Sequence, residues 1–122
     1  MDVLGLTWLG TRTDRHAETV GFFRDVLGLP VRSSEPGFTV LDLPDGASVE
    51  VFGPESANNP HLTSPVAGLR VADLAQAEAE LRAAAIEIVL PRQEGDTGAW
   101  LHLRAPDGHL YELTQEYPTP TA

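Results

Sequence analysis

Apolar positions recur along the chain with the periods of strands and helices, in an order that occurs twice. In the first half, a segment with strand composition over residues 4–12 precedes a helical apolar stripe over residues 15–27. Asp14 is expected to cap this helix, and Gly28 to end it in the left-handed conformation. Further strands are expected at residues 31–32, 38–43 and 48–52. The first half therefore predicts the order β-α-β-β-β.

The second half follows the same order. A strand over residues 67–71 leads into the capping-box sequence Asp73-Leu74-Ala75-Gln76, which predicts the start of a helix. The apolar stripe of this helix consists of Leu74, Ala77, Leu81 and Ala84. Three more strands are expected at residues 86–90, 99–104 and 110–114.

The two halves also share a sequence motif. Residues 44–51 and 106–113, which lie 62 positions apart, both read Pro-Asp-Gly, three variable residues, Glu and an aliphatic residue. The earlier elements correspond at an offset of 58, so loops absorb the difference. We expect a single domain over residues 1–122 with module one at about 4–53, a linker at 54–63 and module two at about 64–116.

Composition and charge narrow the function classes. The 122 residues are 42% hydrophobic and 21% charged, which is typical of one folded domain. Eighteen acidic residues against eight basic ones, all Arg, give a net charge of −10. Without clustered basic side chains we expect neither nucleic acid nor a membrane as partner. The acidity suits a cationic small molecule, or it serves solubility alone.

The sequence lacks both cysteine and apolar targeting or membrane segments. The chain has no Cys, which excludes a disulfide, a thiolate metal site and a Cys nucleophile. No segment reads as a secretion signal or a membrane span, so a cytoplasmic protein is expected.

Several motifs together resemble one known superfamily. They are the segment Phe22-Phe23-Arg24-Asp25-Val26-Leu27-Gly28-Leu29, the Ala105-Pro106-Asp107-Gly108 turn and the βαβββ repeat. In this combination the chain resembles the vicinal oxygen chelate superfamily, which includes glyoxalases, bleomycin-resistance proteins, fosfomycin-resistance enzymes and extradiol dioxygenases. The resemblance covers residues 4–116. It implies an α+β fold in which two βαβββ modules form a cup-shaped mixed β-sheet with helices on the outside, and it implies a homodimer.

The resemblance also implies where a metal would bind. Metal-dependent members use a His or Gln on the first strand of each module and a Glu near the end of a later strand. These positions fall on Trp8 and Val66, which cannot bind a metal, and on Glu50 and Glu112. Two carboxylates alone bind a divalent ion weakly. We therefore expect no metal cofactor.

One alternative to a metal-free site stays open. Strand alternation places Trp100, His102 and Arg104 on one face of their strand, and the resemblance points the first two into the cavity. His102 is then a candidate third ligand, beside Glu50 and Glu112, for one divalent metal ion. The other interpretations of His102 are a proton shuttle and an ordinary strand residue.

Glu50 and Glu112 are repeat-related acids in otherwise apolar strands, which predicts a shared face away from solvent. The alternatives are a solvated strand face and acids that are hydrogen-bonded to a neighbour. If the two carboxylates converge without a metal, repulsion and partial burial raise at least one pKa, and that acid can accept a proton near neutral pH. A catalytic role for Glu50, Glu112 and His102 is expected only if the protein is an enzyme.

Two indoles, Trp8 and Trp100, suit a flat or cationic ligand, although both are equally consistent with core packing. The expected ligand-binding residues are Trp8, Glu50, Val66, Trp100, His102 and Glu112.

The remaining histidines, His16, His61 and His109, are expected at the surface. For His61, which lies in the linker five residues before Val66, a place at the rim of the cavity is the alternative. Arg12 and Arg70 occupy matched places near the ends of the first strands of the modules. Salt bridges with local acids are expected there, with recognition of a ligand anion as the alternative.

Three function classes are compatible with these sequence features. The favoured one is a metal-independent small-molecule binder that sequesters a cationic or aromatic ligand, as bleomycin-resistance proteins do. The second is a lyase, isomerase or dioxygenase that uses an atypical divalent-metal site or Glu-based acid–base chemistry. The third is a regulatory or structural binding domain.

Overall fold

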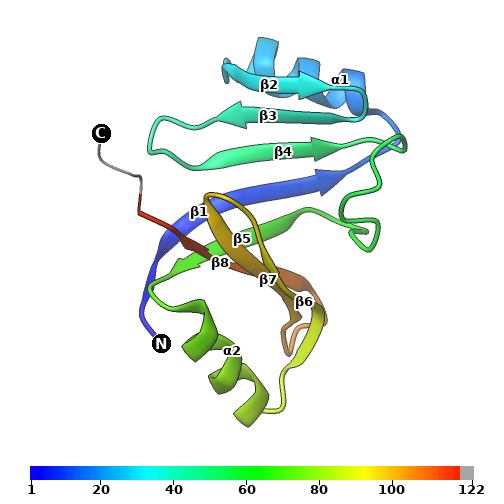
Figure 1. The fold of residues 1–122 in the computed structure, drawn as a ribbon. Coiled ribbons are helices and arrows are strands. Elements are labelled where there is room, and N and C mark those ends of the chain that lie inside the picture. Colours follow the sequence, from blue (N-terminus) through cyan, green and yellow to red (C-terminus); the bar gives the residue numbers. More distant parts are fainter. Residues whose placement is uncertain (119–122) are drawn as a thin grey trace. The chain divides into compact units, whose positions relative to one another are not determined.

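The computed structural model describes residues 1–118, and module one has the predicted order of elements with a divided helix (Figure 1). Its elements are β1 (Val3–Arg12), α1 (His16–Gly21), the π-helix η1 (Phe22–Val26), β2 (Val31–Glu35), β3 (Phe38–Asp42) and β4 (Ser48–Phe52). Module two repeats the order with β5 (Val66–Val71), α2 (Leu74–Ala83), β6 (Glu87–Glu94), β7 (Gly98–Arg104) and β8 (Leu110–Glu116).

The strands form a mixed sheet. They are hydrogen-bonded in the order β2-β3-β4-β1-β5-β8-β7-β6. In each module the first strand pairs in parallel with the last, β1 with β4 and β5 with β8, and the other pairs within a module are antiparallel. The predicted α+β fold of two βαβββ modules with a mixed sheet is confirmed.

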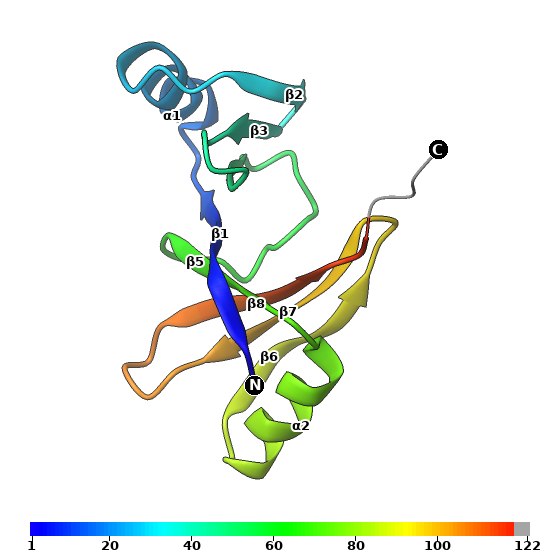
Figure 2. The same ribbon diagram turned by 90° about the vertical axis from the view of Figure 1, so that its left-hand side faces the viewer.

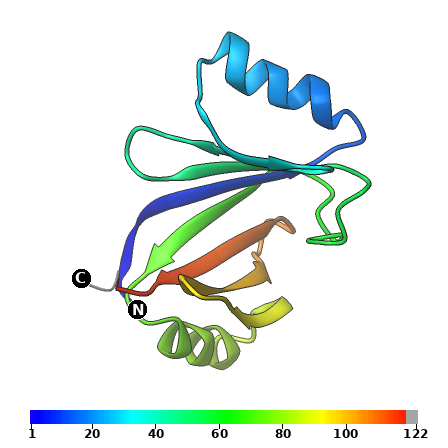
Figure 3. The same cartoon turned by 45° about the horizontal axis from the view of Figure 1, so that its top comes forward.

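The chain divides into two compact units, each with its own core. One unit comprises residues 7–66, and the other comprises residues 1–6 and the chain from Ala67 onward. In the first unit, α1 and η1 lie along one face of the module-one strands (Figure 3). Val20 from α1 packs there against Leu41, Val49 and Val51 from β3 and β4.

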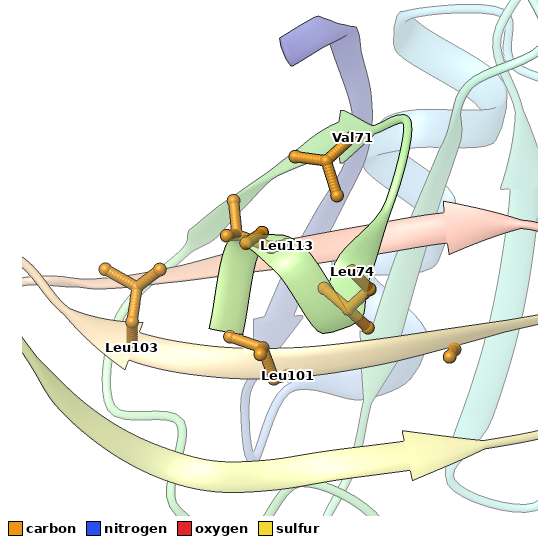
Figure 4. Packing of buried hydrophobic residues seen from close by; sticks show 7 residues of the cluster. Val71, Leu74, Leu101, Leu103 and Leu113 are labelled. Carbon is orange, nitrogen blue, oxygen red and sulfur yellow. The ribbon is translucent and has the colours of Figure 1, made fainter. Parts of the chain in front are cut away.

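In the second unit, α2 lies against the strands of module two (Figure 2). Leu74 and Ala77 of α2 pack on Leu101 and Leu103 of β7 and Leu113 of β8 (Figure 4). On β7 the residues that pack against α2 are alternate ones, as strand geometry requires.

The first helix corrects one expectation from the sequence. Asp14 does not cap it: the structural N-cap is Arg15, without a side-chain bond, and the Thr13 hydroxyl accepts the Arg15 N–H at 3.0 Å. This bond is a short local turn, in which a Thr hydroxyl binds the backbone N–H two residues further along the chain. The helix ends before Gly28, which has the expected positive φ of 76°.

The second helix begins as predicted. The Asp73 side chain accepts the Gln76 N–H at 3.0 Å, and the Leu74 N–H is bound at 2.9 Å by the side chain of Gln115 on β8. Leu74 and Ala77 are buried and Leu81 is partly buried, whereas Ala84 is the exposed C-cap and contributes nothing to the stripe. None of the helices within residues 1–118 has the length and apolar character needed to cross a bilayer.

The core of module two should depend strongly on Leu101, whose side chain is fully buried against α2. We expect Leu101→Ala to lower the free energy of unfolding by about 2–5 kcal/mol, because it removes transfer energy and leaves a cavity. Leu27→Ala, at a position that is 52% exposed, is the matched control and should change it by less than about 1 kcal/mol. Urea denaturation measures both, and equal losses in the two variants would contradict this packing.

Candidate functional site

The candidate site residues lie on the strand faces that point away from the helices. In module two, Ala99, Leu101 and Leu103 face α2, so alternation turns Trp100 and His102 to the opposite face. In module one, Val49 and Val51 pack against α1, which turns Glu50 to the opposite face of β4.

His102 and Glu112 form a buried pair on the module-two face. They are register partners on the antiparallel strands β7 and β8, and His102 Nε2 lies 2.9 Å from a carboxylate oxygen of Glu112. The His102 side chain has no exposed surface and that of Glu112 is only 9% exposed. Glu112 is thus buried and hydrogen-bonded to a neighbour, so the alternative of a solvated strand face is wrong for this acid. His102 is the residue that it pairs with.

Burial raises the pKa of Glu112 above its ordinary value of 4.5, because the ionised carboxylate loses hydration. The hydrogen bond and the charge of His102 act in the opposite direction, since both favour the ionised form. The sequence predicted a raised pKa from acid–acid repulsion and partial burial. Desolvation is the main cause in the structure.

The repeat shows that this pair belongs to module two alone. In module two His102 is opposite Glu112, and in module one the corresponding partner of Glu50 is Val40. A valine cannot hydrogen-bond a carboxylate. The two acids that the sequence treats as equivalent therefore have different neighbours within their own modules.

Glu50 is half-buried, and Trp8 lies near it on β1. Gly10 of β1 is the register partner of Glu50. A Cβ atom added to Gly10 would lie only 1.9 Å from the Trp8 ring, so the indole covers the backbone of Gly10. Sequence reasoning missed Gly10, although a glycine two residues after a tryptophan in a strand is a signal for this kind of packing.

Val66 and Trp100 complete the predicted set. Val66 is buried at the start of β5. Trp100 is half-buried, and its ring lies over Gly95, where an added Cβ would come within 3.3 Å. The structure brings together His102 with Glu112 and, separately, Trp8 with the backbone beside Glu50. The meeting of Glu50 with Glu112, and of the two indoles, stays a prediction.

Other candidate side chains are used for local structure. The expectation that His16 lies at the surface is corrected. Its side chain is half-buried, and its Nε2 lies 3.1 Å from the hydroxyl of the buried Thr39. Arg12 was expected to pair with an acid. Its guanidinium instead donates to the backbone carbonyls of Ser56 and Asn58 in the linker. His109 is exposed as expected and His61 is half-buried. Arg70 pairs with Glu116 at 3.3 Å, as expected.

The residues present do not fit the metal site that the fold family uses. Trp8 and Val66 have no lone pair for a metal, and the carboxylate of Glu112 is already bound by His102. Within residues 1–118, no three His, Asp or Glu side chains are gathered in a way that would hold a metal ion. A divalent ion in a catalytic site normally has three protein ligands.

The sequence profile of the Glyoxalase/Bleomycin resistance protein/Dioxygenase superfamily matches residues 5–113. The chain therefore belongs to this superfamily, whose members include the vicinal oxygen chelate proteins that the motifs resemble. Comparison with curated protein sequences gave no match.

Solved structures agree on the fold. The chain is similar to methylmalonyl-CoA epimerase from Mycobacterium tuberculosis, with 20% identity, a TM-score of 0.73, and coverage of 95% of this chain and 90% of that one. It is also similar to a glyoxalase/bleomycin resistance protein/dioxygenase superfamily member from Vibrio splendidus, with 22% identity, a TM-score of 0.67, and coverage of 94% and 99%. At these identities the likeness shows the fold alone.

Because the pKa of Glu112 is raised in the folded protein, the free energy of unfolding should depend on pH. Between its ordinary value of 4.5 and the raised value in the folded protein, the native state binds more protons at Glu112 than the unfolded chain does. This group therefore lowers stability as pH rises through that window. We expect Glu112→Gln, which keeps a neutral side chain of the same shape, to remove this loss.

The measurement is the difference in the free energy of unfolding between Glu112→Gln and the parent protein at pH 4 and pH 8. The difference should favour the variant more at pH 8. The exposed Glu87→Gln provides the control, with a difference that stays small at both values. A Glu112→Gln difference that is constant with pH would contradict a desolvated carboxyl group.

Proposed function

We propose that the protein binds a small organic molecule without a resident metal ion. One observation carries the proposal. Glu112, at the position where the superfamily resemblance puts a metal-ligating carboxylate, is buried and hydrogen-bonded to His102 at 2.9 Å. The imidazole of His102 therefore lies beside the Glu112 carboxyl, where a metal ion would lie in a metal-dependent member. Trp8 and Val66 at the two nitrogen-ligand positions support the same conclusion.

The ligand in this proposal is cationic or aromatic. The net charge of −10 favours approach of a cation over an anion. Half-buried Trp8 and Trp100, each laid over a glycine backbone, offer aromatic surfaces of the type that stack on flat rings or bind ammonium groups. Trp8, Glu50, Val66, Trp100, His102 and Glu112 are the proposed contact residues.

A second candidate function is proton transfer by an isomerase or lyase. The observation that favours it is the same buried pair, because a carboxyl group with a raised pKa beside an imidazole is a common general acid–base arrangement. The similar structures include ones named methylmalonyl-CoA epimerase, from M. tuberculosis and from Streptomyces coelicolor. In this function Glu112 and His102 hold and move the proton, with Glu50 as a further acid.

The proposal predicts that mildly purified protein contains far less than one equivalent of Mn, Fe, Ni, Cu or Zn. It also predicts that EDTA leaves the midpoint of thermal unfolding unchanged, and that added divalent ions do not raise it. Binding to the native state raises stability by mass action, so the same thermal-shift assay detects ligands from a panel of cationic aromatic compounds, metal-free bleomycin among them.

About one metal ion per chain, removed by EDTA with loss of stability, would overturn the metal-free proposal and make His102 the first residue to mutate. Exchange of substrate protons with solvent, abolished by Glu112→Gln, would favour the proton-transfer function over simple binding.

We also propose a homodimer. A cluster of apolar residues near the start of β1, Val3, Leu4 and Leu6, is 51%, 53% and 68% exposed. Exposed apolar clusters of this kind mark interaction surfaces. Light scattering should give a dimer mass that falls on dilution, and Leu6→Glu should shift the mass toward the monomer, whereas Glu87→Gln should not. A monomer mass at every concentration would contradict this proposal.

A further inference from the structure

The turn that joins β3 to β4 contains an exposed Asp45 followed by Gly46 and is closed by backbone hydrogen bonds (Figure 1). The Leu43 N–H donates to the Ala47 carbonyl at 2.9 Å, and the Gly46 N–H donates to the Leu43 carbonyl at 3.1 Å. The Ala47 N–H donates to Asp45 Oδ1 at 3.0 Å. Gly46 has a φ of 91°, in the left-handed region that favours glycine.

The turn that joins β7 to β8 repeats these bonds one by one. The Ala105 N–H donates to the His109 carbonyl, and the Gly108 N–H donates to the Ala105 carbonyl, both at 2.9 Å. The His109 N–H donates to Oδ1 of the exposed Asp107 at 2.9 Å. Gly108 has a φ of 84°. The two turns therefore share one hydrogen-bond pattern, and neighbouring side chains distinguish them.

The distinguishing side chain is Tyr111. Its hydroxyl donates to Asp107 Oδ2 at 2.8 Å, so both oxygens of this carboxylate are held. At the offset of 62 the residue that corresponds to Tyr111 is Val49, which has no hydroxyl. Within residues 1–118, the Ala47 N–H is the one hydrogen-bond partner of the Asp45 carboxylate. The chain thus carries two matched turns that differ by one bond to the acid.

An aspartate followed by glycine forms a succinimide by attack of the glycine nitrogen on Cγ of the protonated side chain. A C–N bond forms, and the side-chain hydroxyl leaves with the amide proton as water. Water then adds to one of the two ring carbonyls. Opening at the backbone carbonyl leaves the chain linked through the side chain, as isoaspartate, whereas opening at Cγ restores aspartate. The reaction needs no co-reactant besides water, and a glycine nitrogen attacks readily because no side chain hinders it.

Two requirements of this reaction separate the turns. The carboxyl must be protonated so that water is the leaving group, and its Cγ must turn toward the following nitrogen. At Asp107 the bonds from the His109 N–H and the Tyr111 hydroxyl favour the ionised form and lower the pKa of the carboxyl. They also fix the orientation of both oxygens. Asp45 has only the first of these two restraints.

We propose that Asp45 is a site of spontaneous isomerisation to isoaspartate in the folded protein, and that the Tyr111 hydroxyl protects Asp107 from the same modification. None of these three residues is among the proposed ligand contacts, so the modification is independent of the proposed function. An isoaspartate at position 45 adds one backbone carbon to the turn before β4. It also leaves a free α-carboxylate, which is the group that an isoaspartyl methyltransferase methylates.

The test compares the two sites in folded protein aged in mildly acidic buffer. Trypsin places them on separate peptides, residues 33–70 and 105–122. Electron-transfer fragmentation then distinguishes isoaspartate from aspartate in each peptide. Isoaspartate should accumulate at Asp45 at least about threefold faster than at Asp107, because a hydrogen bond to an ionised group is a strong one and protonation weakens it. In urea, where both turns are unfolded, the two rates should differ by less than about twofold.

Three variants test the role of the tyrosine hydroxyl and of the acid. Tyr111→Phe should bring the rate at Asp107 to within about twofold of the rate at Asp45, which itself should not change. Tyr117→Phe removes the hydroxyl of the second tyrosine of the chain and is the matched control that should change neither rate. Asp45→Glu should abolish the modification, because the longer side chain would have to close a larger and less favoured ring. Far-ultraviolet circular dichroism and thermal unfolding establish that each variant is folded.

Equal rates at the two sites in the folded parent protein, or a faster rate at Asp107, would overturn the proposal. The same holds for a difference that persists in urea, because it would then come from the neighbouring sequence and not from the turn. A folded Tyr111→Phe protein with an unchanged rate at Asp107 would overturn the protection by Tyr111. If this variant does not fold, the comparison of the parent protein with and without urea decides the proposal.

Discussion

The burial of the Glu112 carboxyl is the constraint on which the interpretation of this site depends. A carboxylate without water needs a partner, a proton or a metal ion, because an isolated charge is very costly in a protein interior. The chain supplies the partner itself in His102, at 2.9 Å on the neighbouring strand. Removing one member leaves a buried polar group without its hydrogen-bond partner, which typically costs about 1–3 kcal/mol, so the pair is also a structural element of module two.

The two modules share one architecture but surround their acids, Glu112 and Glu50, with different side chains. Both modules place an acid opposite a glycine of their first strand, yet only module two adds a histidine across the next strand pair. Module one adds an indole instead, laid over Gly10. A common scaffold thus carries a buried imidazole–carboxyl pair in one half and an aromatic–carboxylate pair in the other.

The sequence was sufficient for the fold because its local signals agree with one another. The Pro-Asp-Gly turns, the helix cap at Asp73 and the period-two strands predicted every element within a few residues. It misplaced the cap of the first helix: the N-cap is Arg15, which makes no side-chain cap bond, and the Thr13 hydroxyl accepts the Arg15 N–H.

The site was harder to predict, because a site depends on which residues meet across strands. Alternation placed Trp100 and His102 on one face correctly, but the sequence did not identify the pairing of His102 with Glu112, which is fixed by the β7–β8 register. Gly10 was missed because a glycine has no functional group, and its role is to leave space for the Trp8 ring. His16 read as a surface residue because its contact with Thr39 joins positions 23 residues apart.

The central claim is that the imidazole of His102 and the carboxyl of Glu112 bind each other and leave no place for a metal. Nuclear magnetic resonance of protein labelled with nitrogen-15 at histidine tests this most directly, with His102 assigned through a His102→Gln variant. The account predicts that the His102 Nε2 resonance shifts in Glu112→Gln and keeps its width when Mn²⁺ is added. Selective broadening of that resonance by an equivalent of Mn²⁺, with no response to Glu112→Gln, would contradict it.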